Sequence, residues 1–259
     1  ECDNSFTILA ALFFARMFGV EDKVDISPLF ETDRALERAE TVIGKLLGNE
    51  HYRSYVEKRG RICLQTGFSD AGRHLGQTAA CMAIERLRMK MARMLSAYEM
   101  KGIELLIFDT HGESIGRGAH PVSFEDRLNY VSSPKSRAVF EEAGVYFKQE
   151  LSFQGGDGYV FFANEKMAFA TVCRLLSNVI AREDASESDA FYLDTDSSLD
   201  FFITAKDFNA SVMNDPNYAT LLDSFSTNLL YRTGSRMSRR QHDGPGVVRY
   251  NHPSQIRAI

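Results

Sequence analysis

The sequence predicts an α/β protein in which parallel strands alternate with crossover helices. Three strand-like apolar runs, at 24–32, 61–70 and 103–112, each have an acidic residue at or near their end. These acids are Glu31, Asp70 and Asp109, and each lies 39 residues from the next (70 − 31 = 39 and 109 − 70 = 39). This spacing suits one strand–helix unit with a modest insertion. Acids in that position are well placed for function, although strand-terminal carboxylates are also common helix caps.

Helical periodicity is clearest over residues 75–100. Apolar side chains recur there every three or four positions, at Ala80, Ile84, Leu87, Met91, Leu95 and Tyr98. We expect Arg86, Arg88, Lys90 and Arg93 to lie on the other faces of this helix. An earlier apolar run, 8–20, is broken by Arg16, and we interpret it as a core helix.

The chain becomes richer in helical patterns from residue 123 onward. Ser123 is a candidate helix N-cap, and 166–182 predicts a helix with a buried face. The acidic stretch 183–189 is typical of a solvated loop. Helices are expected to continue to about residue 231. The segment 232–257 is rich in Arg, Gly and Pro and indicates a long functional loop.

Composition limits the class of protein. A chain of 259 residues with 44% hydrophobic and 25% charged content predicts one globular domain. Its net charge of −5 argues against a nucleic-acid partner and favours a small-molecule one. Four cysteines without a C-x-x-C pair predict reduced, mostly buried thiols, no zinc site and a cytoplasmic location. The apolar run at 8–20 is too short to cross a bilayer, so we expect no membrane association.

The two ends of the chain suggest a fragment. The sequence opens without methionine and stops on the apolar sequence "QIRAI". We therefore expect residues 1–259 to be part of a longer chain.

The segment 108–121, "FDTHGESIGRGAHP", has the residues of an anion cradle. Gly112, Gly116 and Gly118 allow backbone N–H groups to approach an anion closely, and Arg117 offers a planar fork for phosphate or carboxylate. The pattern matches no standard phosphate loop, and a glycine-rich turn without a ligand is the alternative.

Two of the strand-end acids are candidate metal ligands. Glu31 and Asp70 supply hard oxygen atoms, which favour Mg²⁺ or Mn²⁺ over zinc. The alternative is that each acid pairs with an arginine. A solvated charge run is likewise the alternative for the basic residues of the last segment, Arg236, Arg239, Arg240 and Arg257.

Five motifs, in order along nearly the whole chain, resemble those of phosphoenolpyruvate carboxylase. They are "PLFET" (28–32), "GFSDAGRHLG" (67–76), "FDTHGESIGRGAHP" (108–121), "TGSRMSRR" (233–240) and "IRAI" (256–259). The resemblance implies a helix-rich TIM-type barrel with additional packed helices, of which 1–259 would supply the later strands of the C-terminal part. It also implies a lyase that uses Mg²⁺ or Mn²⁺ and converts phosphoenolpyruvate and bicarbonate to oxaloacetate and phosphate. Such carbon dioxide fixation replenishes the tricarboxylic acid cycle. Family members are typically tetramers, so a homo-oligomer is expected.

The resemblance assigns roles by position. Glu31 and Asp70 match metal-binding carboxylates, and Arg117 matches the second arginine of the glycine-rich substrate loop, formed here by Gly112, Gly116 and Gly118. Arg236 and Arg257 match arginines of the later motifs, with Arg257 near the substrate phosphate. The family's histidine-containing N-terminal half is not in these 259 residues, so we expect the isolated chain to be inactive.

The chain departs from the common family pattern at several positions. Asp109 stands where the family has a histidine, and His111 stands where it has the first loop arginine. Glu113 adds a negative charge beside the cradle, and Arg73 replaces a lysine while keeping its charge. We keep Arg73, Asp109 and His111 as catalytic candidates. Two alternative functions follow: a regulatory relative that only binds metal and phospho-ligand, and another metal-dependent barrel enzyme acting on a phosphorylated keto acid.

Overall fold

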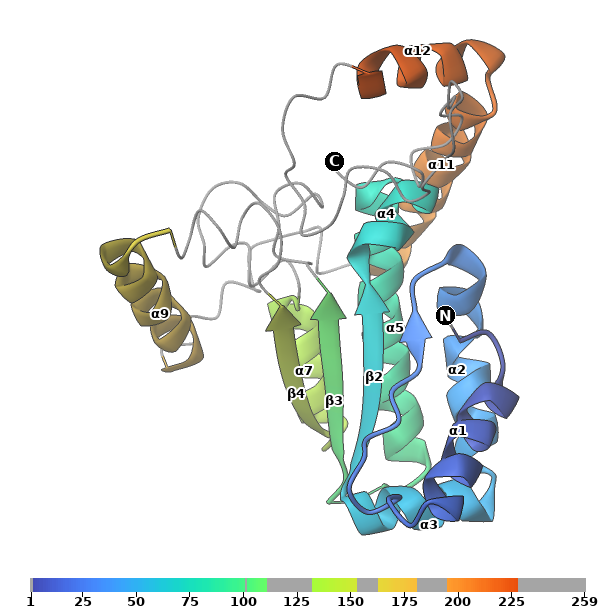
Figure 1. The fold of residues 1–259 in the computed structure, drawn as a ribbon, viewed down its shortest axis with the longest axis vertical. Helices are drawn as coiled ribbons and strands as arrows, with labels where there is room; N and C mark the ends of the chain where they lie inside the picture. The colour runs from blue at the N-terminus through green and yellow to red at the C-terminus, as the bar shows by residue number, and fades with distance from the viewer. Residues whose placement is uncertain (1, 101, 111–131, 153–162, 181–194, 228–259) are drawn as a thin grey trace.

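The computed structural model describes residues 2–100, 102–110, 132–152, 163–180 and 195–227, which form a helix-rich α/β fold (Figure 1). The strands in these residues are β1 (Leu29–Phe30), β2 (Arg61–Gly67), β3 (Glu104–Thr110) and β4 (Tyr146–Ser152). The helices are α1 (Ser5–Met17), α2 (Asp33–Leu47), α3 (Glu50–Arg59), α4 (Phe68–Leu75), α5 (Gln77–Ala97), α7 (Pro134–Glu142), α9 (Glu165–Ile180), α11 (Thr195–Met213) and α12 (Pro216–Thr227).

The strands form one parallel sheet in the order β1-β2-β3-β4. The predicted parallel strands with helical connections are therefore confirmed. The sheet of the described residues is open, with β1 and β4 at its edges, so a closed barrel is not seen in this part of the chain. A TIM barrel closes with eight strands, and the four described here cannot close by themselves.

The first strand is much shorter than the apolar run 24–32 predicts. Only Leu29 and Phe30 pair with β2, opposite Gln65 and Thr66. Pro28 has no N–H group and contributes only its carbonyl oxygen, which accepts from the Gln65 N–H at 2.9 Å. The missing N–H group explains why the pairing of β1 with β2 begins only at Leu29.

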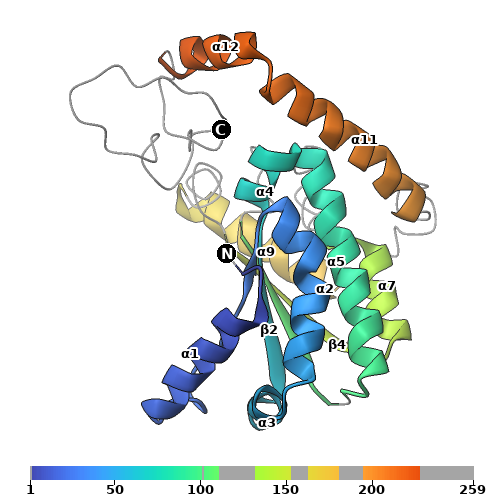
Figure 2. The ribbon, with the colours of Figure 1, turned by 90° about the vertical axis from the view of Figure 1, so that its right-hand side faces the viewer.

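One face of the sheet is covered by α2, α5 and α7 (Figure 2). The main core lies between this face and α5, where Ile62 and Leu64 of β2 and Leu105 and Ile107 of β3 are buried. The predicted apolar positions of α5, Ala80, Ile84, Leu87, Met91 and Leu95, are all buried, whereas Tyr98 at its C-cap is exposed. The long helical pattern is thus confirmed, except that Gly76, with φ of +83°, separates α4 from α5.

Two apolar helices are less buried than predicted. In α1, Ile8, Leu12 and Ala15 are buried on one face, while large side chains elsewhere on the helix are exposed, namely Phe6, Phe13, Phe14 and Met17. The core-helix prediction is therefore correct for that one face only. In α9, Phe169 and Leu176 are exposed, so the buried face predicted for 166–182 is not found among its described side chains.

β4 is a strand that the sequence analysis missed. Its residues read as a mixture of polar and apolar side chains, and Lys148 pairs with Glu150 at 3.4 Å on its half-exposed surface. A strand needs a continuous apolar run only when both of its faces are buried, and one face of β4 carries these exposed charged side chains. Phe147 nevertheless faces the core, where its ring stacks on Phe140 of α7 with centroids 4.4 Å apart.

The last described helices extend from the outer side of the fold. α11 packs along α5 and buries Phe202 there. Its Lys206 donates to the Asp33 carboxylate of α2 at 2.6 Å, which ties two elements far apart in the sequence. Among the described helices, none combines the length and apolar character needed to cross a membrane.

Candidate functional site

The carboxyl ends of β1 and β2 bring Glu31 and Asp70 to the same edge of the sheet. Glu31 directly follows β1, and the β1–β2 register places it level with Gly67, the last residue of β2. A Cβ atom built on Gly67 would lie 2.6 Å from both Cβ and Oε2 of Glu31. Such a distance is far too short for non-bonded atoms, so the Glu31 side chain occupies its position because residue 67 is glycine.

Asp70 lies in a helix and not at the end of a strand. The run 61–70 was expected to be a strand, but β2 ends at Gly67 and α4 begins at Phe68. Asp70 therefore occupies the first turn of α4, where the unpaired N–H groups and the helix dipole favour a negative charge. Arg73 belongs to the same helix, three residues further on.

Asp109 belongs to a different surface from Glu31. Thr66 and Asp109 are register partners, one residue before the level of Gly67 and Thr110. Side chains alternate between the two faces of a strand, and Asp109 meets Arg88 of α5, so it points to the helix-covered face. Asp109 is thus separate from Glu31 and Asp70, which follow the carboxyl ends of β1 and β2 and which we call the strand-end pair.

The Asp109 carboxylate is fully buried, and both of its oxygens accept hydrogen bonds. Arg88 Nη2 and Thr66 Oγ1 each lie 2.5 Å from Oδ1, and Gln149 Nε2 lies 2.8 Å from Oδ2. These donors come from α5, β2 and β4, which surround β3. A buried carboxylate is stable only when paired in this way, so Asp109 serves here as an acceptor within the core.

Arg88 connects this carboxylate to a second one. Its Nη1 lies 3.5 Å from Glu85 Oε2, one turn earlier in α5, and both side chains are almost fully buried. Glu85 Oε1 in turn accepts from Ser133 Oγ, the N-cap of α7. We call these residues, Glu85, Arg88, Asp109 and Ser133, the buried charge cluster.

Sequence reasoning missed Glu85 and Arg88. We expected Arg88 on a face of the helix away from the apolar one, and this was wrong. It follows Ile84 by four residues and precedes Met91 by three, so it shares the buried face with them. A charged residue at an apolar helical position, preceded by an acid at i−3, was the available signal.

The remaining predicted site residues lie outside the described part of the chain. This applies to His111, Gly112, Gly116, Arg117 and Gly118 of the glycine-rich segment. It applies equally to Arg236 and Arg257. Their roles stay predictions.

The strand-end pair suits a magnesium-type ion better than a metal with many protein ligands. No group of three or more His, Cys, Asp or Glu side chains able to hold a metal occurs among the described residues. Mg²⁺ commonly binds one or two carboxylates and takes its other ligands from water and substrate oxygens. Glu31 and Asp70 match that donor set.

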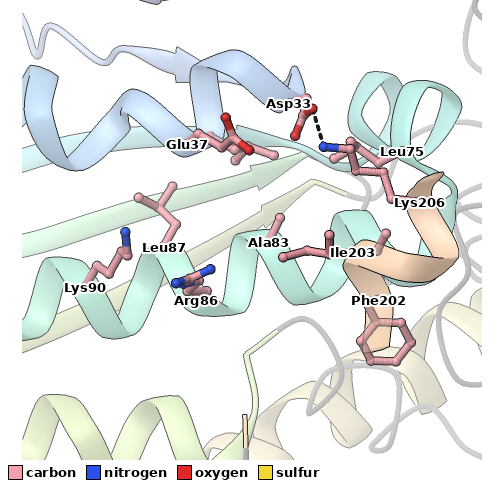
Figure 3. A pocket seen from close by; sticks show the side chains of 12 residues that line it. Asp33, Glu37, Leu75, Ala83, Arg86, Leu87, Lys90, Phe202, Ile203 and Lys206 are labelled. Atoms are coloured by element: carbon pink, nitrogen blue, oxygen red, sulfur yellow. Dashed lines mark hydrogen bonds and ion pairs between the residues drawn. The ribbon is translucent and has the colours of Figure 1, made fainter. Parts of the chain in front are cut away.

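A separate cavity of about 200 Å³ lies among α2, α5 and α11 (Figure 3). Leu75, Leu87 and Phe202 give it apolar walls, and the Asp33–Lys206 pair stands at one side. Neither Glu31 nor Asp70 lines this cavity, so it is separate from the strand-end pair.

Comparison with known proteins finds one family with a similar sequence. The family model of phosphoenolpyruvate carboxylase matches residues 2–124, which contain Glu31, Asp70 and the whole glycine-rich segment 108–121. Over these residues the chain is similar to the phosphoenolpyruvate carboxylase family. Phosphoenolpyruvate carboxylase from Tolumonas auensis is 32% identical over 114 residues, which are 44% of this chain and 12% of that protein. Phosphoenolpyruvate carboxylase 2 from Arabidopsis thaliana is 22% identical over 243 residues, 92% of this chain and 23% of that protein.

The match to phosphoenolpyruvate carboxylase covers only a small part of each relative. Phosphoenolpyruvate carboxylase 1 from Chlamydomonas reinhardtii is also 32% identical over 114 residues, and these make up 11% of its length. The segment with Arg236 and Arg257 lies beyond the family-model match. The chain thus spans less than a quarter of these relatives, and its similarity to them is partial.

Proposed function

We propose that this chain supplies part of the catalytic barrel of a phosphoenolpyruvate carboxylase, a cytoplasmic homo-oligomeric enzyme that forms oxaloacetate and phosphate. The observation that carries the proposal is the position of Glu31 and Asp70. They lie within the family-model match and at neighbouring strand ends, the edge where parallel barrels perform their chemistry. The four parallel strands would be consecutive strands of that barrel.

The strand-end carboxylates would hold the divalent ion. When bound, Mg²⁺ or Mn²⁺ supplies positive charge for the oxygens of the enolpyruvate and its phosphate. Glu31, held over Gly67 directly after β1, and Asp70, in the first turn of α4, would supply two ligands from different parts of the fold. Such fixed positions need little rearrangement when substrate binds.

The arginines would bind the transferred phosphoryl group. Arg117, Arg236 and Arg257 each present a planar fork that suits phosphate oxygens. The backbone N–H groups of Gly112, Gly116 and Gly118 would complete the anion site. In this proposal bicarbonate attacks phosphorus, which gives carboxyphosphate and the enolate of pyruvate. Carbon dioxide released from carboxyphosphate then joins the enolate carbon to give oxaloacetate.

A regulatory relative is the second candidate function, and one observation favours it. The side chain at the position of the family's histidine, Asp109, is buried and fully engaged by Arg88, Thr66 and Gln149. A carboxylate held in this way is poorly placed to exchange protons with a substrate. Such a protein would keep the metal and anion sites without carboxylating.

Release of phosphate from phosphoenolpyruvate by the intact protein, with and without bicarbonate, separates these functions. A carboxylase releases phosphate and forms oxaloacetate only with bicarbonate. A different metal-dependent enzyme releases phosphate without bicarbonate, and a regulatory relative releases none. Either of the last two results would overturn the proposal.

Two matched variants test the metal site by binding as well as by rate. Glu31→Gln and Asp70→Asn remove one anionic ligand each while keeping side-chain size, so Mn²⁺ affinity and turnover should fall by orders of magnitude. Glu37→Gln, an exposed acid of α2, is the control and should change neither. Unchanged Mn²⁺ affinity in both site variants would show that Glu31 and Asp70 do not bind the metal and have a structural role.

A further inference from the structure

We infer that Glu85 and Arg88 of α5 fix the end of β3 and the start of α7, which lie on either side of the segment 111–131, and that Arg88 is thereby a positioning residue for the chemistry proposed at this edge of the sheet. The described residues that flank the segment are Asp109 and Thr110 before it and Ser132 and Ser133 after it. The buried charge cluster contacts both flanks. That these contacts serve substrate binding rests on the proposed function, whereas the attachment itself does not.

The first flank is fixed by Asp109. Its carboxylate accepts from Arg88 Nη2 and Thr66 Oγ1 at 2.5 Å each, and the next residue, Thr110, donates from Oγ1 to the Thr66 carbonyl at 2.5 Å. Gln149 adds a bond from β4 at 2.8 Å. The last two residues of β3 are thereby bonded to both neighbouring strands and to α5. His111 begins directly after this anchored end.

The second flank is fixed by Ser133. Its hydroxyl donates to Glu85 Oε1 and also accepts from the Ser136 N–H at 3.0 Å, which caps α7. The carbonyl of Ser132 accepts from Arg137 Nη1 at 2.7 Å. Ser132 and Ser133 are both fully buried. The start of α7 is therefore tied to the helix that also holds the end of β3.

Arg88 joins the two anchors because its guanidinium is planar and carries several donors. Nη2 reaches Asp109 and Nη1 reaches Glu85, at 2.5 and 3.5 Å. A lysine has a single nitrogen at its tip and cannot reproduce this fork. Arg88 thus sets the position of one flank relative to the other.

Stability alone does not account for such a cluster. Buried ion pairs are often no more stabilising than apolar residues of the same volume, because removing charges from water is costly. The cluster has two carboxylates and one guanidinium, and Arg88 Nε has no hydrogen-bond partner among the described residues. The arrangement instead fixes the orientation of the side chains, because Nη1 and Nη2 of Arg88 each bond one carboxylate in one geometry.

Amide hydrogen exchange on the 259-residue chain tests the inference with three variants. Asp109→Leu removes the first anchor and leaves Arg88 paired with Glu85, so exchange should quicken about tenfold in 104–110 and not in 132–142. Glu85→Met removes the second anchor and should give the reverse pattern. Arg88→Lys keeps the charge but not the fork, and exchange should quicken at both flanks.

Leu95→Ala is the control, because Leu95 is buried in the same helix outside the cluster. It lowers global stability by a packing defect and should change exchange at the two flanks no more than elsewhere. If the cluster variants give the same uniform pattern as Leu95→Ala, or if Arg88→Lys affects only one flank, the inference is overturned. Should one variant fail to fold, the other two still decide between these patterns.

A kinetic measurement on the intact protein separates this inference from the proposed function. In an active carboxylase, Arg88→Lys should raise KM for phosphoenolpyruvate about tenfold and leave Mn²⁺ affinity unchanged, because Glu31 and Asp70 lie outside the cluster. If wild type forms no oxaloacetate but the exchange pattern holds, the proposed function fails and the attachment stands. An unchanged KM in an active Arg88→Lys enzyme would remove its positioning role.

Discussion

Arg88 Nη2 lies 2.5 Å from Asp109 Oδ1, and both side chains are almost completely shielded from water. The pair joins α5 to the penultimate residue of β3. A guanidinium and a carboxylate at this distance form a strong charge-assisted hydrogen bond, but each would be costly to bury without the other. Their dependence on one another can be measured.

Removing Arg88 and the charge of Asp109 together should destabilise the chain less than the sum of the two single changes. Arg88→Met leaves Glu85 and Asp109 buried without a cation, which should cost about 3–5 kcal/mol of unfolding free energy. In the double variant Arg88→Met/Asp109→Asn one of these buried charges is gone. Its loss of unfolding free energy should therefore be smaller than the sum of the losses in Arg88→Met and Asp109→Asn, by about 1 kcal/mol or more. Urea unfolding at pH 7 measures wild type, the two single variants and the double variant. Strict additivity would show that the two side chains do not interact energetically.

Gly67→Ala should displace the Glu31 carboxylate. The new methyl group would meet Glu31 Cβ and Oε2 at 2.6 Å, so the side chain or the backbone must move, at a cost of about 1–3 kcal/mol. Mn²⁺ affinity should fall together with stability. Gly48→Ala is the matched control, because a Cβ there meets only ordinary contacts at 3.5 Å. Equal Mn²⁺ affinity in wild type and Gly67→Ala would separate Glu31 from the metal.

One cysteine should react much faster than the others in the folded protein. Cys173 is exposed, whereas Cys2, Cys63 and Cys81 are buried. Desolvation, followed by the charge of Asp25, raises the pKa of Cys63 to about 11, so its thiolate is scarce at pH 8. Titration with a disulfide reagent should show one rapid thiol and three more after denaturation. Cys173→Ser should abolish the rapid phase, and a rapid phase of two thiols would contradict the burial pattern.

Stability should fall at alkaline pH because of Tyr52. Burial raises the pKa of this tyrosine in the folded chain above the ordinary value of about 10. A raised pKa means that the folded state keeps a proton which the unfolded state releases. Its contribution to stability is therefore complete below pH 10 and is lost as pH rises towards the folded pKa, by up to about 1.4 kcal/mol per pH unit.

Chemical denaturation between pH 8 and 11 measures this slope. Tyr52→Phe should make it shallower, and Tyr98→Phe, at an exposed tyrosine, should leave it as in wild type. The prediction fails if the two variants have the same slope.

Much of the sheet was predictable from the sequence, because β2 has an alternating pattern, β3 is a continuous apolar run and the helix α5 covers both. The periodicity of α5 likewise follows from its buried positions, such as Ile84 and Leu95. β4 was not predictable in this way, since an edge strand with Lys148 and Glu150 on a half-exposed surface lacks an apolar signal. β1 is shorter than predicted because Pro28 has no backbone N–H group to pair with β2.

The site was predictable only in part. The even spacing of Glu31, Asp70 and Asp109 indicated a common edge of a sheet, and the first two do follow neighbouring strands, Glu31 directly after β1 and Asp70 in the first turn of α4. Spacing cannot tell which face of a strand a side chain occupies, and a shift of one residue sends Asp109 to the opposite face from Gly67 and Thr110. The burial of its partner Arg88 was not predicted, because we took a charged side chain as a sign of exposure.

The strand order β1-β2-β3-β4 has a consequence for how the chain is made. Each strand pairs with the one synthesised just before it, so no described strand must wait for a later partner. As the ribosome releases the chain from its N-terminus, every new strand–helix unit can add to an edge that already exists. We therefore expect the sheet to grow in the order of translation, with the buried charge cluster completed only when Ser133 and Gln149 have emerged.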